Sequence, residues 1–142
     1  MVSGILANRK VNLLICGKPY HYVLKFSAYQ LEVFSASREF IFSCYKQTKL
    51  FPNDERFALT QQIRRAAVSV HLNLAEGSSR KSLNERKRFY EISRGSLIEV
   101  DTAFDIAEGL TYLSKEDLLN TGDLLVKTFK MLSKMIDQAN AI

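Results

Sequence analysis

A cluster of arginine and lysine side chains in the middle of the chain is the feature best suited to chemistry. Guanidinium groups recognise phosphates through paired hydrogen bonds, and the helix N-terminus predicted just after Arg80 and Lys81 would itself favour an anion. The cluster consists of Arg64, Arg65, Arg80, Lys81, Arg86, Lys87, Arg88 and Arg94. These residue types predict a surface that binds phosphates, and in particular nucleic acid.

The spacing of these residues also supports a second interpretation. Arg86, Lys87 and Arg88 are consecutive on a predicted helix, and at about 100° per residue they span about 200° of its circumference. Lys81 can also pair with Glu85, and Lys87 with Glu91, each at i to i+4 spacing. A charge run of this kind often forms only a solvated helix face, and this alternative stays open.

Charge is distributed unevenly along the 142 residues, whose formal net charge is +5. Residues 56 to 94 hold nine Lys/Arg against three Asp/Glu, a net charge of +6, whereas residues 95 to 142 hold four against eight, a net charge of -4. If several copies assembled, the basic middle third would be multiplied into a band of positive potential able to follow a phosphate backbone.

Enzyme chemistry has little support in the sequence. The two histidines, His21 and His71, lack the Glu-x-x-His spacing of di-iron bundles, and the two cysteines, Cys16 and Cys44, form no metal-binding motif. The segment after Gly77 is not a phosphate-binding loop, because it lacks the preceding strand and the spacing. The longest apolar run is too short for a membrane span. We therefore expect a non-enzymatic cytoplasmic protein without cofactor, metal site or membrane contact.

Apolar periodicity predicts an all-α protein, an antiparallel up-down-up-down four-helix bundle. Short polar connections favour antiparallel neighbours, and Ser82 to Glu85 and Ser114 to Asp117 have the spacing of helix caps. The predicted helices span residues 31–49, 55–76, 82–109 and 114–136. Residues 29–142 therefore form one predicted domain.

The second and third helices carry the clearest core patterns. Ile63, Ala67, Val70 and Leu74 share one face of the second helix, and Gly77 is expected to end that helix in a left-handed conformation. Gly95 lies inside the third helix, where glycine costs about 1 kcal/mol relative to alanine. Close approach of a neighbouring helix would explain it, although simple tolerance is an equally ordinary explanation.

Residues 1–28 fit the helical pattern poorly, because two apolar runs flank Gly17, Lys18 and Pro19. Three interpretations remain open for this N-terminal extension. It is a flexible or loosely docked segment, a small hairpin packed on the bundle, or the product of an upstream start codon with no bearing on function.

Three segments together resemble a known family. They are Ile63-Arg-Arg-Ala-Ala-Val-Ser-Val-His-Leu-Asn-Leu-Ala-Glu-Gly77, Gly95-Ser-Leu-Ile-Glu-Val100 and Tyr112-Leu-Ser114. The chain resembles the bacterial four helix bundle proteins, also called 23S rRNA intervening-sequence proteins, from about Tyr29 to Ile136. The resemblance implies a small antiparallel bundle that assembles into a homopentameric ring. The sequence departs from the family pattern at His71, where proline is usual, and at Arg86 and Lys87, where apolar residues are frequent.

The resemblance also offers a structural role for part of the basic cluster. The family pairs a Gln-Ile-Arg-Arg segment, here ending in Arg64 and Arg65, with a glutamate of the third helix, here Glu99. A salt bridge from one of these arginines to Glu99 or Glu76 would fix helix register or cross a subunit boundary. We favour this role for Arg64 and Arg65 over direct contact with nucleic acid.

Together these observations predict an oligomeric bundle that binds nucleic acid, with RNA favoured over DNA, through the basic segment. We define the basic segment as residues 80–94, with Arg80, Lys81, Arg86, Lys87, Arg88 and Arg94 as its binding residues. The rival hypothesis is a scaffold that binds a protein partner. Related bundles serve as accessory subunits of reverse transcriptases, so a partner that is itself a nucleic-acid enzyme is part of this alternative.

Overall fold

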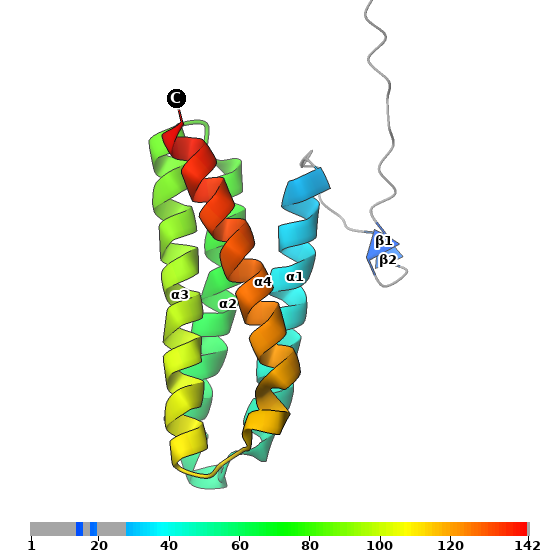
Figure 1. Cartoon of the computed structure of the whole chain (residues 1–142), viewed down its shortest axis with the longest axis vertical. Coiled ribbons are helices and arrows are strands. Elements are labelled where there is room, and N and C mark those ends of the chain that lie inside the picture. The colour runs from blue at the N-terminus through cyan, green and yellow to red at the C-terminus, as the bar shows by residue number, and fades with distance from the viewer. Residues whose placement is uncertain (1–13, 16–17, 20–27, 142) are drawn as a thin grey trace, which may run out of the picture.

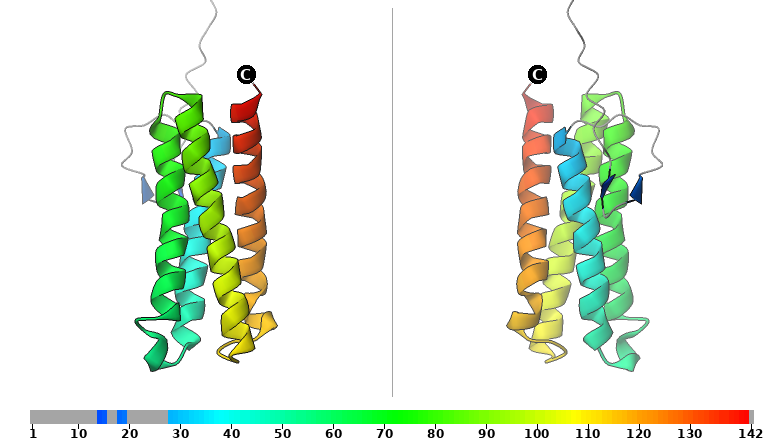
Figure 2. Two further views of the ribbon diagram at one scale, coloured as in Figure 1. Left: turned by 90° about the vertical axis from the view of Figure 1, so that its left-hand side faces the viewer. Right: turned by 90° about the vertical axis from the view of Figure 1, so that its right-hand side faces the viewer.

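The computed structural model describes residues 14–15, 18–19 and 28–141, and the bundle prediction is confirmed there. Four long helices, α1 (Ala28–Gln47), α2 (Leu59–Ser79), α3 (Leu83–Gly109) and α4 (Lys115–Asn140), run alternately up and down (Figure 1). Helix α1 packs on α2 and α4, and α3 packs on the same two helices, so the four close around one core (Figure 2). The short 3-10 helices η1 (Thr48–Leu50) and η2 (Asn53–Glu55) connect α1 to α2.

Little of the predicted N-terminal extension is described. The two-residue strands β1 (Leu14–Ile15) and β2 (Lys18–Pro19) pair antiparallel, with Leu14 opposite Pro19 and Ile15 opposite Lys18. The remainder of residues 1–27 lies outside the described residues, so the three interpretations of the extension are not decided.

The core forms where the apolar stripes of the helices meet. Ile63, Ala67, Val70 and Leu74 of α2 are completely buried, as their spacing predicts. Side chains from the other three helices complete the core, among them Val33, Phe40, Cys44, Leu97, Val100, Leu132 and Ile136. Burial of apolar surface on this scale is the main source of stability for a bundle of this size.

Buried threonine side chains interrupt the apolar stripe of α4, and their hydroxyl groups form hydrogen bonds within the protein. The buried Ser43 and Thr121 hydroxyl oxygens lie 2.6 Å apart across the α1–α4 contact. The Thr128 hydroxyl, also buried, donates to the Leu124 carbonyl at 2.7 Å. These bonds allow polar side chains to occupy core positions without an unsatisfied group.

Gly77 does not end α2, contrary to the prediction. The helix continues through Ser79, and the extended backbone of Arg80 ends it. Gly77 is buried against α3, where an added Cβ would lie 2.7 Å from Cε1 of Tyr90. The absence of a side chain here permits the close approach of α2 and α3.

Gly95 also differs from the prediction, because it does not face another helix of its own chain. It is exposed, and an added Cβ would meet nothing within 4 Å among the described residues. Its neighbours Ser93 and Ser96 are buried instead, with the Ser93 hydroxyl donating to the Val70 carbonyl at 2.6 Å and the Ser96 hydroxyl 2.9 Å from that of Ser69. Small side chains therefore do bring α3 close to α2, but Gly95 is not one of them.

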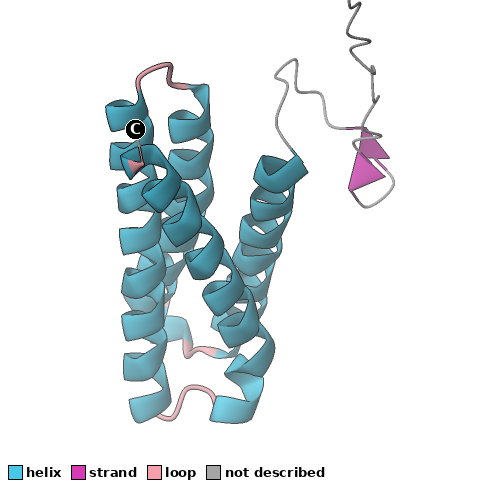
Figure 3. Cartoon of the chain, turned by 45° about the horizontal axis from the view of Figure 1, so that its top comes forward, coloured by secondary structure: helices cyan, strands magenta, loops and turns pink. Residues whose placement is uncertain are grey.

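One end of the elongated bundle carries two connections, and the other end carries one connection together with the start of α1 and the end of α4 (Figure 3). The α2–α3 connection shares its end with the start of α1 and the end of α4, while the α1–α2 and α3–α4 connections share the other (Figure 1). The basic segment thus begins at the end where α2 meets α3, and Glu108, Glu116 and Asp117 lie toward the opposite end.

Candidate nucleic-acid interface

Arg80 and Arg86 of the basic segment hold the α2–α3 connection together. Arg80 forms a salt bridge with Glu76, and its guanidinium carbon lies 5.2 Å from the centre of the Phe89 ring. Arg86 Nε donates to the Arg80 carbonyl oxygen at 2.5 Å. Ser82 caps α3 by accepting from the Glu85 amide at 3.5 Å. Contacts within the chain therefore engage both arginines, although the buried Arg80 Nε has no hydrogen-bond partner among the described residues.

Arg94 and Lys87 lie further along α3. Arg94 donates to the Ser133 hydroxyl of α4 at 3.2 Å, and its guanidinium carbon lies 5.6 Å from the centre of the Phe129 ring. It therefore packs α3 against α4. Lys87 Nζ lies 3.9 Å from Glu91 Oε1, which confirms the predicted pairing on an exposed surface. A pair of this kind contributes little and exchanges readily for a phosphate.

Lys81 and Arg88 are the most available cations of the basic segment. Both are exposed, and neither forms an ion pair or hydrogen bond with another described residue. Lys81 lies in the α2–α3 connection, and Arg88 lies on the outer side of the first turns of α3. The structure thus places the six predicted residues near one end of the bundle, but it leaves two of them free and a third loosely paired.

The predicted salt bridges of Arg64 and Arg65 are wrong within the chain. Glu99 accepts a hydrogen bond from the Gln62 amide, and Glu76 is the partner of Arg80. Arg64 Nε donates to the Thr48 hydroxyl at 2.8 Å, and its guanidinium carbon lies 4.8 Å from the centre of the Tyr45 ring. Arg64 therefore fixes α2 against α1. A bridge across a subunit boundary stays a prediction.

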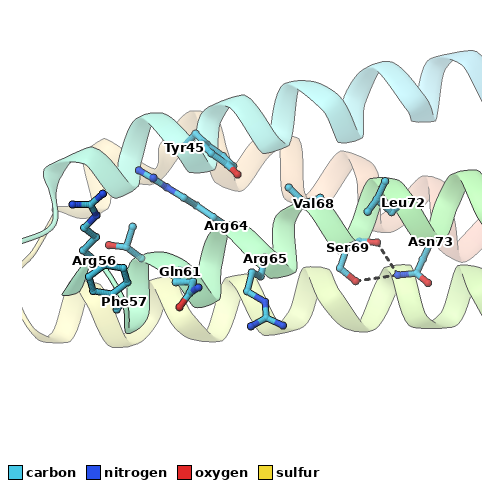
Figure 4. A pocket seen from close by; sticks show the side chains of 11 residues that line it. Tyr45, Arg56, Phe57, Gln61, Arg64, Arg65, Val68, Ser69, Leu72 and Asn73 are labelled. Carbon is cyan, nitrogen blue, oxygen red and sulfur yellow. Dashed lines mark hydrogen bonds between the residues drawn. The ribbon is translucent and has the colours of Figure 1, made fainter. Parts of the chain in front are cut away.

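A groove along the outer side of α2 brings Arg56 together with Arg64 and Arg65 of the predicted cluster, an arrangement that the sequence analysis did not predict (Figure 4). Its volume is about 590 Å³, and no carboxylate is present among the described residues that line it. We call it the arginine groove, lined by Tyr45, Arg56, Phe57, Thr60, Gln61, Arg64, Arg65, Val68, Ser69, Leu72 and Asn73. Two large apolar side chains are strongly exposed in it, since Phe57 is 80% and Leu72 61% accessible.

One sequence signal could have revealed this groove. Phe57, Gln61, Arg65, Val68 and Leu72 follow one another at steps of four, four, three and four, which is a second helical stripe beside the core stripe. Phe57 precedes α2, so its place in this stripe is clear only when the conformation of the backbone between η2 and α2 is known. An amphipathic helix with apolar residues on its outer side is typical of a surface that another molecule covers.

The titratable groups of the core are inert. Burial raises the pKa of the Cys44 thiol to about 12, so the thiol stays protonated and unreactive. Burial and the nearby Arg38 charge lower the pKa of His71, whose Nδ1 lies 2.7 Å from the Ser37 hydroxyl oxygen. No group of three His, Cys, Asp or Glu side chains within the described part of the chain could hold a metal ion.

The sequence profile of 23S rRNA-intervening sequence proteins matches residues 29–134, about three quarters of the chain. The chain belongs to this family. A search of curated proteins found no match. In this 23S rRNA-intervening sequence protein the matched residues include all of the basic segment and all of the arginine groove.

The family match ends close to the point where the packing of α4 ends. Met131 and Leu132 are buried inside the matched span, and Met135 and Ile136 continue the same contact just beyond it. None of the described helices of this 23S rRNA-intervening sequence protein is long and apolar enough to cross a membrane.

Proposed function

We propose that this protein is a non-enzymatic, cytoplasmic homo-oligomer, a pentamer by family resemblance, that binds nucleic acid, with RNA favoured, through its basic segment. The observation that carries the proposal is the pair of exposed cations Lys81 and Arg88 at the end where α2 meets α3. Lys87 lies beside them and is released from Glu91 at little cost, because their separation of 3.9 Å is that of a weak surface pair.

The remaining arginines of the basic segment support the site by shaping it. Arg80 and Arg86 hold the α2–α3 connection in one conformation, so Lys81 projects from a fixed turn and its approach to a phosphate costs less conformational entropy. Without an exposed tryptophan or a flat aromatic sheet, recognition of the phosphate backbone and shape is expected, and base-specific reading is not.

Assembly makes so small a site effective. Two or three phosphate contacts from one copy give weak binding, but a ring presents the same contacts from every copy to one backbone. Arg64 acts within the chain, through Thr48 and Tyr45. Our proposal therefore assigns phosphate contact to Lys81, Lys87 and Arg88, and a supporting role to Arg80, Arg86 and Arg94.

The proposal is tested by fluorescence anisotropy with structured RNA and with duplex DNA over a salt series. The variant Lys81→Ser/Arg88→Ser should bind about tenfold more weakly, and its salt dependence should fall by about 1 for each phosphate contact removed. The matched control is Lys49→Ser/Lys115→Ser, which removes two exposed lysines from the opposite end of the bundle. The control should bind like the unaltered protein.

Two results would refute the proposal. One is the absence of salt-dependent binding to either nucleic acid by the unaltered protein. The other is equal weakening by the site variant and the control, because net charge and not position would then determine affinity. Either result would favour the scaffold hypothesis, in which the oligomer binds a protein partner.

A further inference from the structure

A second groove flanks α1 on the side opposite the arginine groove. It lies between α1 and the first turns of α4 and has a volume of about 750 Å³. We call it the acidic groove, because Glu39, Glu116 and Asp117 line it and Lys46 is the one lysine among the described residues that do so. The Ser114 amide and hydroxyl donate to Asp117 and lower the pKa of its carboxyl, so this charge is present at neutral pH.

The two grooves are complementary in charge. The arginine groove presents Arg56, Arg64 and Arg65 and no carboxylate among its described lining residues, whereas the acidic groove carries three carboxylates against one lysine. Arg56, Arg65, Glu39 and Glu116 are all exposed. Glu39 accepts a hydrogen bond from the Ser35 hydroxyl at 3.3 Å, and the Arg56 guanidinium carbon lies 5.3 Å from the centre of the Phe57 ring. Such an arrangement favours contact between unlike grooves and opposes contact between like ones.

Both grooves also expose large apolar side chains. Phe57 and Leu72 of the arginine groove are 80% and 61% accessible, and Phe42 and Leu119 of the acidic groove are 56% and 67% accessible. Apolar residues with a rim of charged ones are typical of a protein interface, although in the acidic groove Lys46 and the Arg38 guanidinium, 5.0 Å from the centre of the Phe42 ring, reduce the negative charge. The two leucines favour a protein occupant over a nucleic acid, whose backbone would leave them exposed.

The positions of the grooves determine how two copies would meet. Tyr45 lines the arginine groove while Phe42 and Lys46 line the acidic groove, so both grooves adjoin the same turns of α1. Arg56 and Phe57 of the arginine groove belong to the α1–α2 connection, and Glu116 and Asp117 of the acidic groove lie at the start of α4, so both grooves reach the end of the bundle that carries these connections. Two copies standing side by side in the same direction would therefore bring an arginine groove and an acidic groove to the same height.

We propose that the arginine groove of one copy packs on the acidic groove of the next, a head-to-tail contact in which each copy uses two different surfaces. The inference rests on the homo-oligomer part of the proposed function and is independent of nucleic-acid binding. It also assigns Arg65 to a subunit boundary, with carboxylates of α1 and α4 as its partners.

Charge reversal tests the proposal by light scattering. The variant Arg56→Glu/Arg65→Glu and the variant Glu39→Lys/Glu116→Lys should each lower the molar mass from a multiple of 16.2 kDa toward 16.2 kDa. The fourfold variant that combines all these changes should recover the mass of the unaltered protein, because each interface again joins unlike charges. Arg64 and Asp117 are left unchanged, since the first fixes α2 against α1 and the second caps α4.

A control and a parallel binding assay complete the design. The control Asp101→Lys/Asp105→Lys reverses two exposed carboxylates of α3 that line neither groove, and it should leave the mass unchanged. Circular dichroism should show equal helix content in all variants. A monomeric unaltered protein, full assembly of both double variants, or a folded fourfold variant that stays monomeric would each overturn the proposal. Loss of RNA binding with assembly intact would instead contradict the proposed function alone.

Discussion

Replacing Gly77 with alanine is expected to loosen the contact between α2 and α3. The added Cβ would lie 2.7 Å from Cε1 and 2.8 Å from Cδ1 of Tyr90, and 3.1 Å from Cβ of Phe89. Contacts below 3.0 Å are not tolerated, so a neighbour must move. The Tyr90 ring cannot rotate away easily, because it is 3% accessible and its hydroxyl oxygen lies 3.3 Å from that of Ser78.

Two opposing effects determine the size of the change. Alanine is better than glycine inside a helix by about 1 kcal/mol, whereas overpacking a buried contact costs about 1–3 kcal/mol. Two ring atoms are too close, so we place the overpacking cost at the upper end of this range. The net result is a loss of about 1–2 kcal/mol in the free energy of unfolding.

Gly95→Ala is the matched control, since it makes the same exchange in a helix interior without a neighbour. No described atom lies within 4 Å of the added Cβ, so the helix preference acts alone and stability should rise by about 0.5–1 kcal/mol. Urea unfolding followed by circular dichroism measures both variants. The reasoning fails if Gly77→Ala is as stable as Gly95→Ala. A destabilised Gly95→Ala would show that this glycine meets another subunit.

Two further predictions concern pH and capping. The pKa of His71 is lowered in the folded protein, so the unfolded chain binds a proton more readily. The free energy of unfolding should therefore be highest above the ordinary histidine pKa of about 6.5 and should fall as the pH drops below it. Urea midpoints at pH 5 and pH 7.5 should therefore differ less for His71→Gln than for the unaltered protein, and an equal difference in both would contradict the assignment. Ser114→Ala removes the hydrogen bond that the Ser114 hydroxyl accepts from the Asp117 amide and the one that it donates to the Asp117 carboxylate. It should lower the free energy of unfolding by about 1 kcal/mol, which thermal unfolding would detect as a lower Tm.

The helices were largely predictable because their apolar residues recur with one period over several turns. The capping spacing predicted the starts of α3 and α4 to within about a residue, because a serine at the N-cap accepts a hydrogen bond from a backbone amide of the first helical turn. The start of α2 was placed too early, at Glu55. That residue precedes the helix, whose N-cap is Ala58, and its carboxylate accepts from the Leu59 amide at 3.1 Å and from the Tyr112 hydroxyl at 2.8 Å.

The candidate site was less predictable, because its availability depends on contacts between helices. Arg80 and Lys81 each have a glutamate four residues away, Glu76 and Glu85, but among the described residues only Arg80 forms the ion pair, and the predicted pairing of Lys81 with Glu85 is absent. The role of Gly77 was likewise hidden, since a glycine near the end of an apolar stripe usually ends the helix, and only the position of Tyr90 on α3 explains its burial. Patterns along a chain identify the elements, whereas the partners of a polar side chain are decided by packing.

The two ends of the bundle also differ in charge, which gives the molecule an electrostatic polarity along its long axis. Neighbouring antiparallel helices oppose one another's dipoles, so the asymmetry along the long axis comes from side chains. Lys81 and Arg88 lie toward one end, and Glu108, Glu116 and Asp117 toward the other. In the electric field of a polyanion, the molecule would rotate before contact, so that its positive end faces the polyanion and its negative end faces away. The far carboxylates, which need never contact a ligand, would thus help to set the orientation of the encounter and its sensitivity to salt.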